Sequence, residues 1–143
     1  MKKTFLLSSL IMFCFFTSCS KDDDKKEENS VDSFIGKWIL SEEFDDDEVY
    51  ELTECDKKTY YIFNSNNTLM FTETYTINED PECIENSING TWVDKGNNNY
   101  DFIFDDEGTE VIEKFNLTFT KTTLTLVDLR EGFGYTEVYI KAN

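Results

Sequence analysis

Four glutamates that alternate with apolar residues are the side chains of this sequence best able to do chemistry. They are Glu42, Glu73, Glu113 and Glu137, and each lies two positions from an aromatic or aliphatic residue on both sides. In an extended chain, residues two apart face the same side, so each glutamate shares a face with apolar neighbours. A few carboxylates in an apolar wall are typical of a ligand pocket. A bulge or a strand end would instead turn them to solvent, where charged residues usually lie.

Nothing else in the chain indicates an enzyme. The sequence has no histidine, no serine in a nucleophile-elbow pattern and no glycine-rich phosphate loop. A pair of glutamates can still transfer protons, so a hydrolase or isomerase that uses such a pair is the remote alternative. We therefore expect no enzymatic activity and no cofactor.

Two acidic stretches, residues 45–48 and 105–108, carry the oxygen ligands that calcium prefers. Neither follows the ligand spacing of an EF-hand, and acidic loops are usually just solvated. We therefore predict no metal site, with calcium binding by these loops as the alternative.

The elements that must position the glutamates are β-strands, because threonine, aromatic and β-branched residues dominate and turn residues recur at short spacing. No long segment has helical periodicity, although a short helical turn is expected at residues 31–35, just before Gly36. Eight strands are predicted, at residues 37–44, 58–64, 68–77, 88–94, 99–105, 110–120, 122–129 and 134–141.

Eight short antiparallel strands in sequence must protect their edges, and closing into an up-and-down barrel removes the edges altogether. An open sandwich is the alternative. A barrel of this size is either filled by side chains or holds one small ligand. The residues expected to form a ligand site are Trp38, Phe71, Tyr75, Trp92, Phe102, Phe104 and Phe115 as walls, with Glu73 and Glu113 as polar anchors.

A pair of glycine-x-tryptophan motifs connects the chain to a known family. Gly36-Lys37-Trp38 opens the first predicted strand and Gly90-Thr91-Trp92 lies in the fourth, with Cys55 and Cys83 between them. This spacing resembles the short lipocalin-like domain of bacterial surface lipoproteins, over residues 35–140. The resemblance implies a barrel that the first tryptophan closes at one end, with a cysteine before the second strand facing one after the third.

One arginine tests how far this resemblance extends. In lipocalins an arginine from the end of the last strands stacks on the tryptophan. The only arginine here, Arg130, falls in the turn before the final predicted strand. It either covers Trp38 or is simply exposed.

The N-terminus resembles the signal peptide of bacterial lipoproteins. Two lysines precede an apolar run at residues 5–16, and Thr17-Ser18-Cys19 follows as in a lipobox, with Phe16 where leucine is usual. The resemblance implies cleavage before Cys19 and a diacylglycerol on its thiol. Residues 20–24 (SKDDD) resemble the export signal that sends such lipoproteins to the outer cell surface.

These features predict three parts: a signal peptide at residues 1–18, a disordered acidic tether at 19–33 and a barrel domain at 34–143. The predicted location is the outer membrane, with lipid anchoring at the cell surface or the periplasmic face.

The cysteines fit an exported protein. If Cys14 leaves with the signal and Cys19 is acylated, Cys55 and Cys83 remain. An exported compartment permits a disulfide between them. Metal binding by the pair is the alternative, although there is no histidine and no C-x-x-C spacing to support it.

The net charge narrows the range of partners. The chain has 30 acidic and 13 basic residues, for a formal net charge of −17. Such a charge argues against nucleic acid as a partner. The predicted function is non-catalytic binding of a small apolar or amphipathic ligand. The alternative is a surface module with a filled barrel that contacts protein or glycan through its loops.

Overall fold

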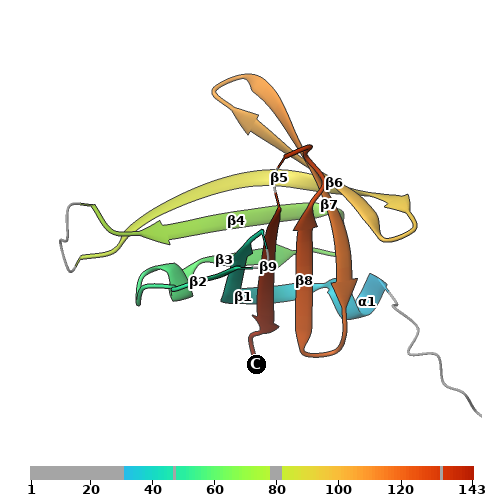
Figure 1. Ribbon diagram of the computed structural model, residues 1–143. Coiled ribbons are helices and arrows are strands. Elements are labelled where there is room, and N and C mark those ends of the chain that lie inside the picture. Colours follow the sequence, from blue (N-terminus) through green and yellow to red (C-terminus); the bar gives the residue numbers. More distant parts are fainter. Residues whose placement is uncertain (1–30, 47, 78–81, 133) are drawn as a thin grey trace, which may run out of the picture.

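The strands form a closed antiparallel barrel in the computed structural model, which describes residues 31–46, 48–77, 82–132 and 134–143 (Figure 1). The barrel strands are β1 (Gly36–Asp45), β3 (Tyr60–Phe63), β4 (Thr68–Tyr75), β5 (Ile84–Gly96), β6 (Asn99–Asp106), β7 (Thr109–Phe119), β8 (Thr123–Asp128) and β9 (Tyr135–Lys141). Each pairs with the next in this order, and β1 also pairs with β9, which closes the sheet. The predicted all-β barrel of eight strands is confirmed, and the open sandwich is not what forms. The predicted signal peptide and Cys19 lie outside the described residues.

A ninth, short strand and a longer fifth strand depart from the sequence-based expectation. Strand β2 (Glu48–Tyr50) pairs with the last residues of β1, and its three residues were too few to give a strand pattern. Strand β5 begins at Ile84 rather than residue 88 and stays paired with β4 over that extra length. The sequence did not predict the first four residues of β5, because they are mainly polar and are held by backbone pairing rather than by side-chain burial.

A bulge in β1 decides which side of the sheet Glu42 faces, as the alternative given for the four glutamates anticipated. Opposite Val138 in β9 lie two residues, Ser41 and Glu42, so β1 carries a bulge there. The bulge shifts the alternation by one residue. Glu42 therefore faces solvent, and Glu43 turns towards the interior, where it lies directly opposite Glu137.

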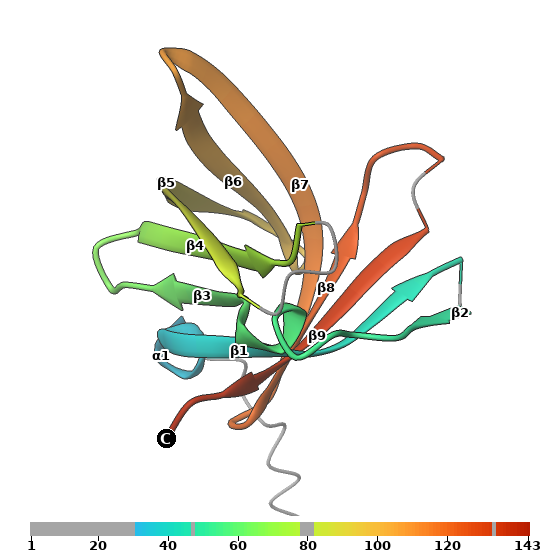
Figure 2. The same cartoon turned by 90° about the vertical axis from the view of Figure 1, so that its left-hand side faces the viewer.

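Successive strands alternate in direction, so the turns between them lie alternately at the two ends of the barrel (Figure 2). At the end where β1 begins, called here the closed end, the turns are 64–67, 97–98 and 120–122. The opposite or open end carries β2, the 3-10 helix η1 (Asp56–Lys58), the turn at 107–108 and the connections from β4 to β5 and from β8 to β9.

A helical turn fills the closed end. This helix, α1 (Val31–Phe34), matches the predicted turn, and the Phe34 ring is fully buried. The ring centroid of Phe34 lies 4.1 Å from that of Phe63 and 5.3 Å from that of Trp92. The Trp38 indole nitrogen donates a 2.8 Å hydrogen bond to the Phe34 carbonyl oxygen. Aromatic packing and this bond hold α1 as a plug.

A lysine, rather than the arginine considered above, covers Trp38. The Lys141 ammonium lies 5.1 Å from the centroid of the Trp38 ring and donates a 2.9 Å hydrogen bond to the Ser33 carbonyl oxygen. It therefore ties the last strand to α1. Arg130 lies at the open end instead, bonded to Asp128.

Packed side chains fill the barrel from the closed end through its middle. Both tryptophans are buried there, as is a central set of Tyr61, Phe63, Leu69, Phe102, Phe115, Leu117, Leu124, Leu126 and Tyr139. The space for a ligand is therefore confined to the open end.

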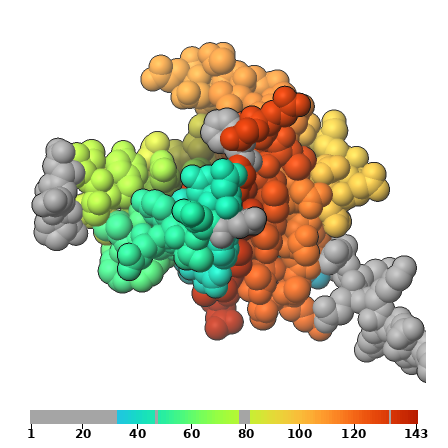
Figure 3. Space-filling model, viewed as in Figure 1, coloured from blue at the N-terminus to red at the C-terminus, as the bar shows by residue number. Residues whose placement is uncertain are grey.

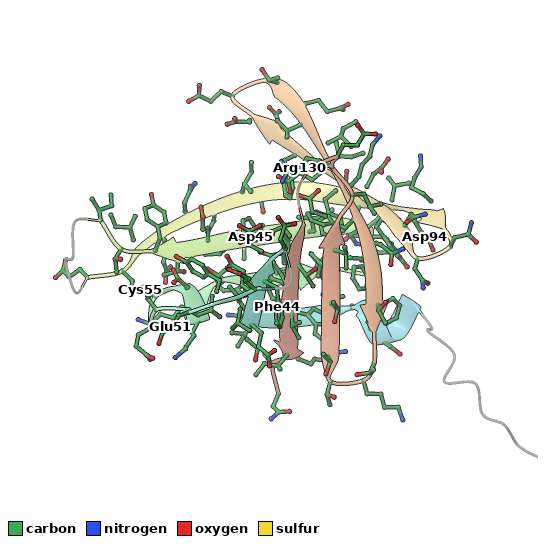
Figure 4. The ribbon with its side chains drawn as sticks, viewed as in Figure 1. Phe44, Asp45, Glu51, Cys55, Asp94 and Arg130 are labelled. Carbon is green, nitrogen blue, oxygen red and sulfur yellow. A yellow bond between two sulfur atoms is a disulfide. The ribbon has the colours of Figure 1, made fainter. Side chains whose placement is uncertain are left out.

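The predicted disulfide between Cys55 and Cys83 is confirmed, with an S–S distance of 2.00 Å. It joins the residue before η1 to the residue before β5. In Figure 4, Cys55 lies beside Glu51 near one end of the long β4–β5 pair, whereas Asp94 lies near the other end of β5. The bridge therefore braces the open end. Within the described residues, no helix is long and apolar enough to cross a bilayer.

Candidate functional site

A cavity of about 270 Å³ lies at the open end of the barrel. Strands β1, β2, β4 and β9 and the region of η1 supply its walls, because all of them reach this end. Its lining consists of Leu40, Glu43, Tyr50, Asp56, Thr59, Phe71, Glu73, Thr74, Tyr75, Tyr135 and Glu137. Four of these residues carry carboxylates, four carry aromatic rings, and no lysine or arginine is among them.

Register explains why two of the carboxylates meet. Glu43 of β1 and Glu137 of β9 are cross-strand partners, and Glu137 is also the partner of Leu126, a buried core residue of β8. Directly opposed residues of antiparallel strands face the same side, so both glutamates turn inward. The Tyr135 hydroxyl bonds to Glu43, and burial, followed by this bond, holds the Tyr135 pKa well above its ordinary value.

Glu137 is the most perturbed acid of the cavity. Burial raises its pKa from 4.5 to about 7, and the negative charges of Glu43, Glu113 and Asp128 add to the rise. The nearby Tyr139 hydroxyl offsets part of the rise by hydrogen bonding to the carboxylate. At neutral pH, Glu137 therefore exchanges between a protonated and an ionised form.

Two further acids point inward next to the cavity. Glu113 lies opposite Phe102, and Asp128 lies opposite Phe115, so both share the face of the core. Burial raises the pKa of Glu113, with Asp128 adding to the rise and Arg130 opposing it. Burial also acts to raise the pKa of Asp128, but its hydrogen bonds from Arg130, one of 2.8 Å, keep it below the ordinary value. The inner face near the open end is therefore strongly anionic.

The structure divides the nine predicted ligand residues between three places. Phe71, Glu73 and Tyr75 line the cavity, although Glu73 is exposed to solvent rather than buried as an inward anchor would be. Glu113 is half-buried beside it. The remaining five, Trp38, Trp92, Phe102, Phe104 and Phe115, are buried in the packed interior and do not line it.

Four charged or aromatic lining residues, Glu43, Tyr50, Tyr135 and Glu137, are among those that the sequence did not assign to a ligand site. Glu43 was not named because no sequence signal marks the bulge beside Ser41. Glu137 and Tyr135 lay on the predicted inner face, and their proximity to Glu73 depends on barrel closure. Tyr50 belongs to the short strand β2, which had no recognisable pattern.

A second hollow lies outside the barrel. It is a groove of about 460 Å³ along β5, β6 and the β6–β7 hairpin, and it is lined by Asn89, Gly90, Thr91, Ile103, Phe104, Asp105, Gly108 and Glu110. Gly90 leaves room here for the Phe104 ring, because a Cβ at this position would lie 2.8 Å from it. The groove is more open than the cavity and carries fewer charges.

Asp47 of the first acidic loop lies outside the described residues. Among the residues that the structure describes, no group of three or more cysteine, aspartate or glutamate side chains is placed to hold a metal ion. In the second loop, Asp105 accepts a 2.7 Å hydrogen bond from the Gly108 amide, which stabilises the turn.

Comparison with known proteins agrees with the barrel geometry. The sequence model of the lipocalin-like domain family matches residues 34–126. The structure is similar to that of a lipocalin-like protein from Bacteroides uniformis, with a TM-score of 0.54 and 16% identity over 77% of this chain and 99% of that one. It is also similar to an uncharacterized protein from Bacteroides eggerthii, with a TM-score of 0.53 and 15% identity over 76% of this chain and 98% of that one. No curated protein matches the sequence with significance.

Proposed function

Since this chain belongs to the lipocalin-like domain family, we propose that it binds a small amphipathic ligand, without catalysis, in the open end of its barrel. The family generally binds ligands rather than catalysing reactions. The observation that carries the proposal is the 270 Å³ cavity, whose mainly polar lining combines carboxylates with aromatic and aliphatic side chains.

The position of the cavity supports an amphipathic ligand over a purely apolar one. Leu40 and Phe71 extend the packed core to the cavity, whereas Glu43, Glu73 and Glu137 supply charge around them. A purely apolar ligand would cover these carboxylates without giving them partners, which costs free energy. A molecule with one apolar and one polar end satisfies both parts.

The binding test uses the small neutral fluorescent amphiphile 1-naphthylamine, which has no ring beyond its fused pair, on the folded domain. We expect saturable binding at one site, followed by the rise in dye fluorescence. Glu73→Trp places bulk in the cavity and should abolish binding. Glu42→Trp places the same bulk on the outer face of the barrel and should leave binding unchanged. Equal effects of the two variants would contradict a site in the cavity.

We also propose that the domain is held at the outer membrane by a lipid on Cys19. The support is the lipobox-like sequence before this cysteine and the charged stretch after it. Wild-type protein expressed with its signal should incorporate labelled palmitate and sediment with membranes. Cys19→Ala should do neither, whereas Cys14→Ala should behave as wild type. If the wild-type protein incorporated no labelled palmitate, the proposed lipid anchor would be wrong.

One observation favours a second candidate function, contact with a protein or glycan through the surface. The tip of the β6–β7 hairpin stands away from the body of the molecule (Figure 3). Val111 and Ile112 are exposed on this hairpin, close in sequence to the groove residues Gly108 and Glu110. Ile112→Glu would abolish contact with such a partner while dye binding continued. Glu73→Trp would have the opposite effects.

A further inference from the structure

We propose that the occupant of the open-end cavity is an organic cation, namely a protonated amine that carries one small apolar group. This inference rests on the proposed function and specifies the chemical class of the ligand.

The charge of the lining points to a cation. Four lining residues carry carboxylates and none carries a positive charge. Two lysines directly follow the lining residue Asp56 in the sequence, but both bond to groups outside the lining. Lys57 bonds to Glu54, and Lys58 bonds to the sulfur of Cys83. Arg130 bonds to Asp128 near the open end, and neither residue lines the cavity. A positive ligand therefore meets a negative potential that the described lining does not itself neutralise.

The pair of Glu43 and Glu137 indicates where the charged end binds. Two carboxylates placed directly opposite each other on neighbouring strands repel when both are ionised. A proton on Glu137 relieves this repulsion in the empty cavity, in keeping with its raised pKa. An ammonium group between the two carboxylates would take over that role and form hydrogen bonds to both.

A buried hydroxyl supplies an independent observation at the same place. Thr74 lines the cavity, and its fully buried hydroxyl oxygen has no hydrogen-bond partner among the described atoms. Buried polar groups usually have partners, and a ligand with polar hydrogens provides them.

The aromatic side chains complete a site for an amine. Phe71, Tyr50, Tyr75 and Tyr135 all line the cavity. Cations are attracted to the faces of aromatic rings, and sites for organic ammonium groups are commonly built from several of them. A bare metal ion fits less well, because the described residues contain no group of three ligating side chains. Calcium requires six to eight oxygen ligands.

The volume limits the size of the ligand. A cavity of about 270 Å³ lies just below the range of roughly 300–1,000 Å³ that is typical of drug-sized ligands. The packed core below it leaves no room for a long chain. One ring or a short branched chain attached to the ammonium is the expected size.

The test compares three probes of similar shape by isothermal titration calorimetry on the folded domain. They are 2-phenylethylamine, which is cationic, 2-phenylethanol, which is neutral, and 3-phenylpropanoate, which is anionic. The amine should bind at least about tenfold more tightly than the alcohol, and the acid most weakly, because bonds to charged groups are the stronger ones.

A matched pair of variants locates the effect. The double variant Glu43→Gln with Glu137→Gln should remove the preference for the amine while retaining binding of the alcohol. Glu42→Gln, one residue away on the outer face, should bind all three probes as wild type does. If Glu42→Gln reduced amine binding as much as the double variant does, the effect would be general surface charge, and the proposed site would be wrong.

Proton release gives a second readout. Several charged or titratable groups surround Glu137 and set its proton affinity. They are Glu43 of β1, Tyr61 of β3, Glu113 of β7, Asp128 of β8 with its partner Arg130, and Tyr135 and Tyr139 of β9 itself. Near pH 6.5, amine binding should release a fraction of a proton, seen as a dependence of the binding heat on the buffer. Glu137→Gln should abolish this dependence.

The outcomes separate this inference from the function on which it rests. Equal or tighter binding of the alcohol or the acid would overturn the cation and leave a ligand-binding barrel. If the naphthylamine dye and all three probes failed to bind to protein shown to be folded, the proposed function would fall as well.

Discussion

Single residues decide which charges reach the cavity, and the bulge at Ser41 is the clearest case. Strict alternation along β1 would place Glu42 inside with Trp38 and Leu40. The bulge puts Glu43 there instead, opposite Glu137. Alternation placed Glu42 on the apolar face, with a bulge as the alternative. The sequence could not decide between the two, because a bulge depends on how two strands pair and leaves no mark in one strand.

The raised pKa of Glu137 predicts that replacing this residue stabilises the protein in a pH-dependent way. The pKa is about 7 in the folded protein against an ordinary value of 4.5, so the folded state binds more protons between these values. The contribution of the residue to stability is therefore present below pH 4.5 and lost as the pH rises through 7. The unfolding free energy of Glu137→Gln, measured relative to that of wild type, should therefore rise by about 2 kcal/mol between pH 4 and pH 8. This figure is smaller than the full linkage value because the cavity is open to solvent.

Urea denaturation at the two pH values measures this gain. Glu42→Gln, which replaces an exposed acid on the same barrel, is the control and should show no comparable change. A gain that was equal at pH 4 and pH 8 would mean that Glu137 has an ordinary pKa.

Gly90 provides a second prediction at this scale. A Cβ at this position would lie 2.5 Å from the Ile103 carbonyl oxygen and 2.8 Å from the Phe104 ring. Gly90→Ala should therefore cost about 1–3 kcal/mol, as overpacking usually does. Chemical denaturation would measure it, with Asn89→Ala at the exposed neighbouring position as the control. An unchanged midpoint would show that the Phe104 ring moves aside without cost.

At the scale of the elements, alternation was enough to predict the strands but not all their ends. The long threonine-rich and aromatic segments gave β4, β6 and β7 nearly as they form. The start of β5 was missed because residues 84–87 (IENS) have little β-propensity and are held by pairing with β4. Likewise, Lys58 was assigned to a strand but belongs to η1, whose position depends on the disulfide and on contacts with β1 and β4.

The disulfide provides a prediction for the elements that it joins. Cys55 and Cys83 are 28 positions apart. Restricting a loop of this length in the unfolded chain should stabilise the folded state by about 3–4 kcal/mol in the chain-entropy model. The double variant Cys55→Ser with Cys83→Ser should lose about this much in guanidinium denaturation.

Reductant supplies the control for this prediction. It should lower the unfolding free energy of wild type towards that of the double variant and leave the double variant unchanged. Because the bridge braces the open end, ligand affinity should fall both in reduced wild-type protein and in the double variant. A wild-type protein indifferent to reductant would contradict a structural role for the bond.

At the scale of the whole molecule, the barrel separates a rigid closed end from a polar open end. Closure of the sheet into a barrel was predictable, because a sheet in which each strand pairs with the next along the chain leaves its first and last strands as two edges that can pair with each other. The location of the cavity was not. It depends on how far aromatic side chains from α1 and several strands fill the interior, and that volume is set only by the assembled barrel. Five of the nine predicted ligand residues are therefore core residues.

The plug at the closed end gives a prediction on this scale. Phe34 is fully buried among four aromatic rings. Phe34→Ala should cost about 3–5 kcal/mol, as large cavities in cores do. The loss should appear as a lower denaturation midpoint. Lys121→Ala, in the exposed turn between β7 and β8, should leave the midpoint unchanged.

Ligand binding separates this effect from damage at the open end. The folded fraction of Phe34→Ala should bind 2-phenylethylamine with wild-type affinity, since Phe34 does not line the cavity. A loss of affinity larger than the loss of folded protein would show that the two ends are coupled.

The two ends of the described chain meet at one pole of the barrel. Residue 31 begins the plug, and the Ala142 amide donates a 2.9 Å hydrogen bond to the Lys37 carbonyl oxygen in the same region. Whatever precedes α1 or follows β9 therefore leaves from the pole opposite the cavity. A sensor chip that captures the domain by a tag at either terminus would present every molecule with its mouth towards the flowing solution. The same geometry would let a tethered copy meet its ligand from the side that faces away from its support.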